Sequence, residues 1–152
     1  MVIIEDSRQK PEKNKHIRDQ LEKMGYKVVR SKVYCGDYTW ATDQRICVDT
    51  KADLQEVCGN LTQQHERFKA ECERAKEAGI QLVILVQEPS VKILSDVCGW
   101  YNWRKKTNPR ATSGKQLYRI MSTMTERYGV AWQFCTKGTV GKRIVELLEG
   151  KQ

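Results

Sequence analysis

The stretch Gly36–Lys51, GDYTWATDQRICVDTK, combines β-branched and aromatic residues with two well-spaced aspartates and a lysine. Short period-two patterns at Asp37–Trp40 and Arg45–Asp49 predict two strands, and turn-forming residues separate them. Residues so placed on neighbouring antiparallel strands can lie near one another. We therefore expect the carboxylates of Asp37 and Asp49 to converge.

Lys51 lies two residues after Asp49 and should project from the same face of the strand. Two unpaired carboxylates repel each other, and a hard divalent cation relieves that repulsion. Mg²⁺, or Mn²⁺, held by Asp37, Asp49 and the backbone carbonyl of Thr50 would polarise a phosphate and lower the pKa of a bound water. Lys51 would orient or help deprotonate that water. The pattern indicates phosphodiester hydrolysis, although a lysine beside a strand aspartate is also found as a structural ion pair.

Further strands are predicted on both sides of this stretch. Val2–Ile4 is a short apolar run, and Tyr26–Val29 adds a strand that we expect to form a three-stranded meander with the two described above. Ile80–Val86 is apolar at nearly every position, which is typical of a central strand covered on both faces. Val130–Cys135 predicts the last strand.

Helices are predicted where apolar residues recur at spacings of three and four. The predicted helical segments are Lys13–Met24, Ala52–Val57, Leu61–Ala75, a short turn at Ser90–Val97, Leu117–Tyr128 and Val140–Leu148. We expect Gly59 and Asn60 to interrupt the chain between the second and third of these. The alternation of strands and helices favours one α/β domain over residues 1–152, with a mixed central sheet flanked by helices.

The charge of the chain is unevenly distributed. The 152 residues include 27 Lys+Arg and 19 Asp+Glu, a formal net charge of +8. Residues at about 88–113 form an insert, and no acidic residue occurs between Asp96 and Glu126. Its basic residues are interleaved with aromatics: Trp100, Tyr101, Trp103, Arg104, Lys105, Lys106 and Arg110. This mixture favours contact with nucleic acid, through phosphate neutralisation and base stacking, over a solvated loop or a structural aromatic cluster.

Other classes of function are disfavoured by composition. The longest apolar run, Leu82–Val86, is far shorter than the ~20 residues of a membrane span. The amino terminus has no secretion signal, so we expect a cytoplasmic protein, nucleoid-associated or in a host cytoplasm if a virus encodes it. The six cysteines form no Cys-x-x-Cys pair, which disfavours a zinc site and a thiol-based regulatory role.

Several motifs together resemble the XPF-type structure-specific endonuclease domain, of the PD-(D/E)xK nuclease superfamily. The resemblance covers residues 2–87 and the strand and helix after Val130, and it implies a restriction-endonuclease-like core. The motifs are Asp6-Ser7-Arg8, Gly36-Asp37-Tyr38, Val48-Asp49-Thr50-Lys51, Asn60-Leu61 and Arg67-Phe68.

The resemblance also implies roles for individual residues. Asp37 and Asp49 would bind metal, and Lys51 would be catalytic. Asp6 would help complete the acidic site, while Arg8 would contact phosphate or brace that acid; Arg67 is either a surface charge or a phosphate contact. The chain departs from the family pattern at Asp49, where a glutamate is usual, at Thr50, where an arginine is usual, and at Gln55, where an acid is common. The aspartate is one methylene shorter than glutamate but is still a metal ligand in the wider fold.

The expected substrate is branched, flapped or otherwise structured DNA, in the context of DNA repair or recombination. The resemblance further implies a homodimer formed through the nuclease domain, and we expect no membrane partner. The rival interpretation is a catalytically inactive nuclease-fold module that binds or scaffolds DNA. Intact Asp37, Asp49 and Lys51 favour the enzyme, because binding alone requires none of them.

Overall fold

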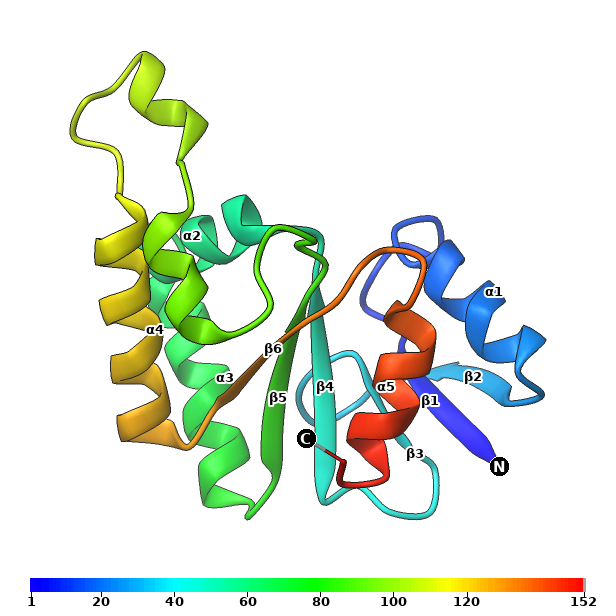
Figure 1. Ribbon diagram of the computed structural model, residues 1–152. Helices are drawn as coiled ribbons and strands as arrows, with labels where there is room; N and C mark the ends of the chain where they lie inside the picture. The colour runs from blue at the N-terminus through cyan, green and yellow to red at the C-terminus, as the bar shows by residue number, and fades with distance from the viewer. Residues whose placement is uncertain (152) are drawn as a thin grey trace.

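The computed structural model describes residues 1–151 and has the predicted α/β architecture (Figure 1). The strands are β1 (Val2–Asp6), β2 (Lys27–Ser31), β3 (Tyr38–Trp40), β4 (Ile46–Lys51), β5 (Gln81–Val86) and β6 (Ala131–Phe134). The helices are α1 (Lys15–Lys23), α2 (Leu54–Thr62), α3 (His65–Glu77), α4 (Gly114–Tyr128) and α5 (Val140–Leu148), with 3₁₀ turns η1 (Leu94–Gly99) and η2 (Trp103–Lys106). None of the helices within residues 1–151 is long and apolar enough to cross a membrane.

The six strands form one mixed sheet in the order β2-β1-β3-β4-β5-β6. β1 is parallel to β2, and β4, β5 and β6 are parallel to one another, while β3 is antiparallel to both of its neighbours. The mixed sheet is confirmed, but the predicted meander is wrong, because β2 pairs with β1 at the sheet edge and not with β3. A helix joins β1 to β2, and such a crossover connects parallel strands.

Helices cover both faces of the sheet (Figure 1). Each face has its own hydrophobic core. Helices α2, α3 and α4 pack on one face, which receives Leu82, Ile84 and Val86 of β5. Helices α1 and α5 pack on the other face, which receives Val83 and Leu85. The apolar run in β5 is therefore explained by burial on both faces, as predicted.

Helix α2 is longer than the sequence predicts. The expected interruption at Gly59 and Asn60 is wrong, since α2 continues to Thr62 and α3 begins at His65. A glycine inside a helix costs only about 0.5–1 kcal/mol relative to alanine. The burial of Leu54, Val57, Cys58 and Leu61 along one side of α2 is sufficient to offset that cost.

Candidate active site

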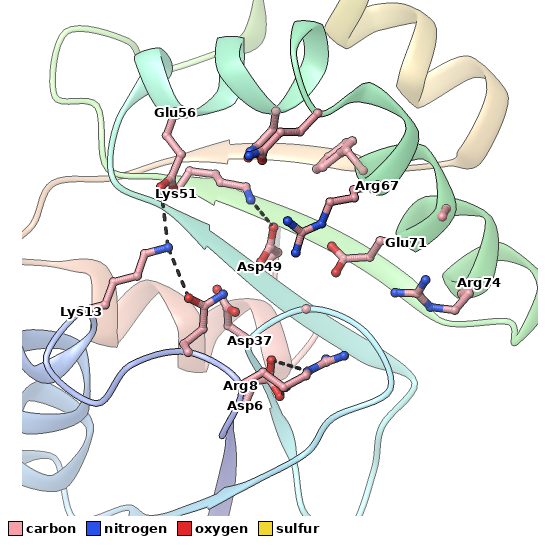
Figure 2. Close-up of a pocket in the computed structure, with 16 residues that line it drawn as sticks. Asp6, Arg8, Lys13, Asp37, Asp49, Lys51, Glu56, Arg67, Glu71 and Arg74 are labelled. Atoms are coloured by element: carbon pink, nitrogen blue, oxygen red, sulfur yellow. Dashed lines mark hydrogen bonds and ion pairs between the residues drawn. The ribbon is translucent and has the colours of Figure 1, made fainter.

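An open pocket of about 550 Å³ lies at one edge of the sheet (Figure 2). β1 and β4 run in the same direction and β3 runs in the opposite direction between them, so the carboxyl ends of β1 and β4 meet the amino end of β3. The loop after β1 forms one wall, and α2 and α3 form the other. The pocket brings together six of the residues predicted from sequence: Asp6, Arg8, Asp37, Asp49, Lys51 and Arg67.

Backbone hydrogen bonds fix the floor of the pocket. The amide of Asp6 donates to the carbonyl oxygen of Asp37 at 2.7 Å, and the amide of Asp37 donates to the carbonyl oxygen of Val48 at 2.9 Å. Gly36 has a φ of +73°, and a Cβ there would lie 3.2 Å from the same carbonyl oxygen of Val48. A glycine at this position therefore permits both the left-handed backbone and the close approach to β4.

Asp37 and Asp49 are buried near each other, as their spacing led us to expect, with relative exposures of 4% and 6%. Oδ2 of Asp37 accepts hydrogen bonds from the amide and from Oγ1 of Thr50, both at 3.0 Å. Burial, and then the negative charge of Asp49, raises the pKa of Asp37 well above its ordinary value. The floor of the pocket is thus a site where the protein alone tolerates two negative charges poorly.

Lys51 lies beside this pair on the same side of β4. Its Nζ is 2.9 Å from Oδ2 of Asp49 and 5.7 Å from the ring centroid of Phe68. Burial is the largest single effect and opposes the charged lysine, but contact with Asp49 and the charges of Asp37 and Glu56 together outweigh it and raise the pKa of Lys51 above its ordinary value. The ammonium group therefore offsets part of the repulsion between the two aspartates.

The two aspartates fit a hard divalent cation. Oδ2 of Asp49 is buried and, apart from its ion pair with Nζ of Lys51 at 2.9 Å, has no hydrogen-bond partner in residues 1–151. Within that range, no group of three or more His, Cys, Asp or Glu side chains is arranged to hold a metal ion. Mg²⁺, however, usually keeps several waters and takes only one or two protein carboxylates together with substrate phosphate. Asp37 and Asp49 are the residues that could hold it.

Asp6 lines the pocket, but its carboxylate is engaged by other groups. Nε of Arg8 lies 3.0 Å from both of its oxygens, and the amide of Val33 lies 3.4 Å from Oδ1. Arg8 also donates to the carbonyl oxygen of Val33 at 2.9 Å. Arg8 thus braces Asp6, which is one of the two roles expected for it, and the contribution of Asp6 to the acidic site stays a prediction.

Glu71 and Arg74 were not among the residues predicted from sequence, yet both face the pocket from α3 (Figure 2). Burial, and then the charge of Asp49, raises the pKa of Glu71 to about 7. Arg67, Glu71 and Arg74 are spaced by four and three residues, so they share one face of α3. This spacing was visible in the sequence beside the apolar stripe that predicts the helix.

The predicted nucleic-acid contacts of the insert lie outside this pocket. Trp103, Arg104 and Arg110 line a separate cleft against α2, and Lys105 and Lys106 belong to the same 3₁₀ turn, η2. Trp100 differs from these residues, since it is partly buried and packs against the core of α2, α3 and α4. Less of its ring is therefore free to stack on a base than the sequence suggested.

Glu5 anchors the wall of the pocket that the β1–α1 loop forms. Its buried Oε1 accepts hydrogen bonds from Arg18 at 2.9 Å and from Arg30 at 3.0 Å. Arg18 also donates to the carbonyl oxygen of Pro11 at 3.3 Å, and Arg30 donates to the carbonyl oxygen of Gln9. One buried carboxylate thus orients the two arginines that hold the loop in place.

The mixed sheet, the helices on both of its faces and the pocket at the ends of its central strands define an α/β domain. A model of the ERCC4 domain matches residues 6–138, and the chain belongs to that family. The resemblance to the XPF-type domain is therefore confirmed. No match was found among curated proteins.

Solved structures that share this fold include two of XPF from Aeropyrum pernix. XPF from Aeropyrum pernix matches with a TM-score of 0.68 and 20% sequence identity, over 98% of this chain and 64% of that chain. XPF from Aeropyrum pernix in complex with DNA matches with a TM-score of 0.68 and 19% identity, over 97% of this chain and 63% of that chain. This chain thus spans less than two thirds of the length of either structure.

Asp37→Asn is expected to stabilise the metal-free protein at pH 7. The raised pKa means that the folded state favours the protonated carboxyl, so the carboxylate costs stability above the ordinary pKa. Asparagine removes that charge and keeps an oxygen for Thr50. A gain of about 1 kcal/mol would raise the melting temperature by about 2–4 °C. Mg²⁺ should raise the melting temperature of the wild type but not of this variant.

Calorimetry checks this expectation, with Asp43→Asn as the control. Asp43 is an aspartate near the surface, paired with Arg45 away from the pocket, so its loss should leave the response to Mg²⁺ unchanged. A lower melting temperature for Asp37→Asn, or equal responses to Mg²⁺ in all three proteins, would contradict the assignment.

Glu5→Gln is expected to loosen the β1–α1 loop. Removing one partner of a buried ion pair costs about 3–5 kcal/mol, and here it releases both Arg18 and Arg30. Amide hydrogen exchange should accelerate in residues 9–14 more than in β5. Glu77→Gln, at an exposed position on α3, is the control; equal protection of the loop in both variants would show that Glu5 is not its anchor.

Proposed function

We propose that this protein is a divalent-metal-dependent endonuclease that hydrolyses phosphodiester bonds in branched, flapped or otherwise structured DNA. The observation that carries the proposal is the gathering of Asp37, Asp49 and Lys51 on the floor of one pocket. Arginines on two walls of the same pocket, Arg8 and Arg67, supply positive charge around this acidic floor. Carboxylates for a cation, surrounded by cations for phosphates, suit the cleavage of a polyanion.

Each residue on the floor has a distinct task in this proposal. Asp37 and Asp49 would hold the cation, which when bound polarises the scissile phosphate and lowers the pKa of a bound water. Lys51 is held as an ammonium by Asp49, so it orients the attacking water and offsets negative charge on the phosphate. Thr50 fixes the orientation of Asp37 through two hydrogen bonds.

The rim of the pocket favours DNA as the substrate class. Arg8 is fixed by Asp6 but remains about half exposed. Within residues 1–151 no ion pair engages Arg67 or Arg74, which also line the pocket. Arginines that are not neutralised by the protein are available for phosphate oxygens. The net charge of +8 adds long-range attraction for a nucleic acid.

The departures from the family pattern raise the alternative of an inactive DNA-binding or scaffold module. At Gln55, however, the structure weakens that alternative. Nε2 of Gln55 donates to Oδ1 of Asn102 at 3.2 Å, so the side chain is directed to the insert, while its neighbour Glu56 lines the pocket. The substitution at Gln55 therefore removes no charge from the pocket itself.

Incubation of the protein with linear, forked and four-way DNA in Mg²⁺, Mn²⁺ or chelator tests the proposal. We expect cleavage of the forked or junction substrates with either metal and none with chelator. Asp49→Ala should abolish cleavage while DNA affinity persists or rises, because a negative charge leaves the pocket. Unchanged cleavage by Asp49→Ala would remove the metal assignment, and binding without cleavage by the wild type would favour the scaffold alternative.

Lys51→Ala should lower kcat by about 10²–10³-fold, the usual effect of removing one preorganised charged donor, and should affect metal affinity much less. Lys51→Arg retains the charge and should lose less. Loss of folding without a specific loss of kcat would identify a structural ion pair.

Light scattering on the same preparations tests the homodimer that the resemblance implies.

A further inference from the structure

The insert contains a distinct arm, residues 100–113, between η1 and α4. Figure 1 shows the arm (yellow-green) extending past the amino end of α4 and away from the sheet. It carries none of the residues of the acidic pocket. Any function of its basic and aromatic side chains is therefore separate from that of the acidic pocket.

Asn102 gives the arm a defined shape. Its side chain is 2% exposed; Nδ2 donates to the carbonyl oxygen of Thr112 at 2.9 Å, and Oδ1 accepts from the amide of Arg104 at 3.0 Å. The same Oδ1 accepts from Nε2 of Gln55 at 3.2 Å. One buried amide thus joins the two ends of the arm and attaches them to α2.

The root of the arm is equally constrained. A Cβ at Gly114 would lie 2.5 Å from the carbonyl oxygen of Trp100 and 2.6 Å from that of Val97, so only glycine allows α4 to start against η1. Ser113 caps α4 by accepting from the amide of Gln116 at 3.2 Å. The arm is therefore held as a fixed element beside α2.

Between the arm and α2 lies a cleft of about 420 Å³. Its α2 side is uncharged, with Gln55, Gly59 and Gln63, and the buried Oε1 of Gln55 has no hydrogen-bond partner in residues 1–151. Its arm side presents Trp103 and Arg104. The volume falls within the range of about 300–1,000 Å³ that is usual for small-ligand sites, so the cleft can admit a nucleotide-sized group.

The charge of the arm selects for an anion. No acidic residue occurs between Asp96 and Glu126. Four cations belong to the arm, and within residues 1–151 none of them makes a salt bridge: Arg104, Lys105, Lys106 and Arg110. These cations are available for phosphates.

The side chain of Trp103 favours nucleic acid over other polyanions. Trp103 is 57% exposed, and the guanidinium carbon of Arg104 lies 5.6 Å from its ring centroid. An exposed indole ring beside unpaired cations can stack on a base and hold the adjoining phosphates. A base inside a duplex is already stacked on both faces, so this use of the ring requires unpaired nucleotides.

We propose that the cleft between the arm and α2 binds an unpaired nucleic-acid strand that leaves the duplex of the substrate. A base stacks on Trp103, and Arg104 and Arg110 contact the neighbouring phosphates. The inference rests on the proposed action on structured DNA, and it specifies which feature of that DNA the protein holds: a single-stranded tail.

The binding of labelled DNA by the wild-type protein in chelator tests the proposal without cleavage. Three probes are compared by fluorescence anisotropy: a fork with a single-stranded tail, the same fork with the tail made double-stranded, and a blunt duplex. Trp103→Ala should weaken binding of the tailed fork by about 5- to 150-fold, the usual effect of losing one stacked base, and should affect the blunt duplex little. Trp103→Phe should restore most of the affinity.

The cations are tested by the double variant Arg104→Ala/Arg110→Ala. It should flatten the dependence of log affinity on log salt by about 0.7 for each phosphate that the protein no longer neutralises, for the tailed fork only. Lys23→Ala/Lys27→Ala removes the same charge at α1 and the β2 edge, and it is the matched control. Thermal unfolding verifies that each variant is folded.

Several outcomes would overturn the proposal. Equal losses of affinity for the tailed fork and the blunt duplex would make the arm a duplex-binding element, and losses no greater than those of the control would leave it without a nucleic-acid role. Competition by polyglutamate as effective as that by single-stranded DNA would indicate a general polyanion surface. The nuclease proposal is judged separately. Cleavage by the protein, with arm variants that bind the tailed fork normally, would refute only this inference. Binding of the tail without cleavage would refute only the nuclease proposal.

Discussion

The repulsion between Asp37 and Asp49 is the constraint on which the pocket depends. Two carboxylates with only 4% and 6% exposure are costly when both are charged, and the raised pKa of Asp37 expresses that cost. The chain relieves it only in part, through the ammonium of Lys51 and two hydrogen bonds from Thr50. One ammonium does not balance two carboxylates, and the remaining negative charge between Asp37 and Asp49 is what a divalent cation would stabilise.

The strand order maintains that constraint. β3 delivers Asp37 from the antiparallel direction, and β4 delivers Asp49 at its carboxyl end, so the two side chains reach one edge of the sheet from opposite directions along the chain. Hydrogen bonds from the amides of Asp6 and Asp37 close this edge. The repulsion would be relieved if β3 and β4 moved apart, but that movement would break these hydrogen bonds. The sheet therefore holds the two carboxylates together.

The sequence was sufficient for most elements and for the floor of the site, but not for the pairing of the strands. Period-two patterns located β3 and β4, and the spacing of Asp49 and Lys51 placed both side chains correctly. The position of β2 was missed because the meander assumed that successive strands are neighbours, which holds only about two thirds of the time. The helix between β1 and β2 was the better guide, since parallel strands need a crossover connection and that connection is usually a helix.

Local sequence patterns also could not predict which groups the titratable side chains contact in the folded protein. The spacing of Asp6 and Arg8 agrees with an ion pair, but whether Asp6 also reaches the acidic group depends on where Val33 lies, which only the fold determines. Glu71 was missed for the converse reason. Its proximity to Asp49 arises from the packing of α3 on β5 and β4, and no pattern within α3 reports the charge that lies opposite.

Helix α2 connects the two sites of the molecule. Glu56 and Asn60, one turn apart, line the acidic pocket, whereas Gln55, Gly59 and Gln63 line the cleft against the arm. A short helix whose apolar side is buried in the core behaves as a rigid body, so the spacing between the two sites is fixed by its cross-section and not by a flexible linker. If a strand stacks on Trp103 while the pocket acts as proposed, the stacked base and the acidic pair would be held at a set distance from each other. Under both proposals, the position of the cut would then be set by where the unpaired strand begins and not by the base sequence.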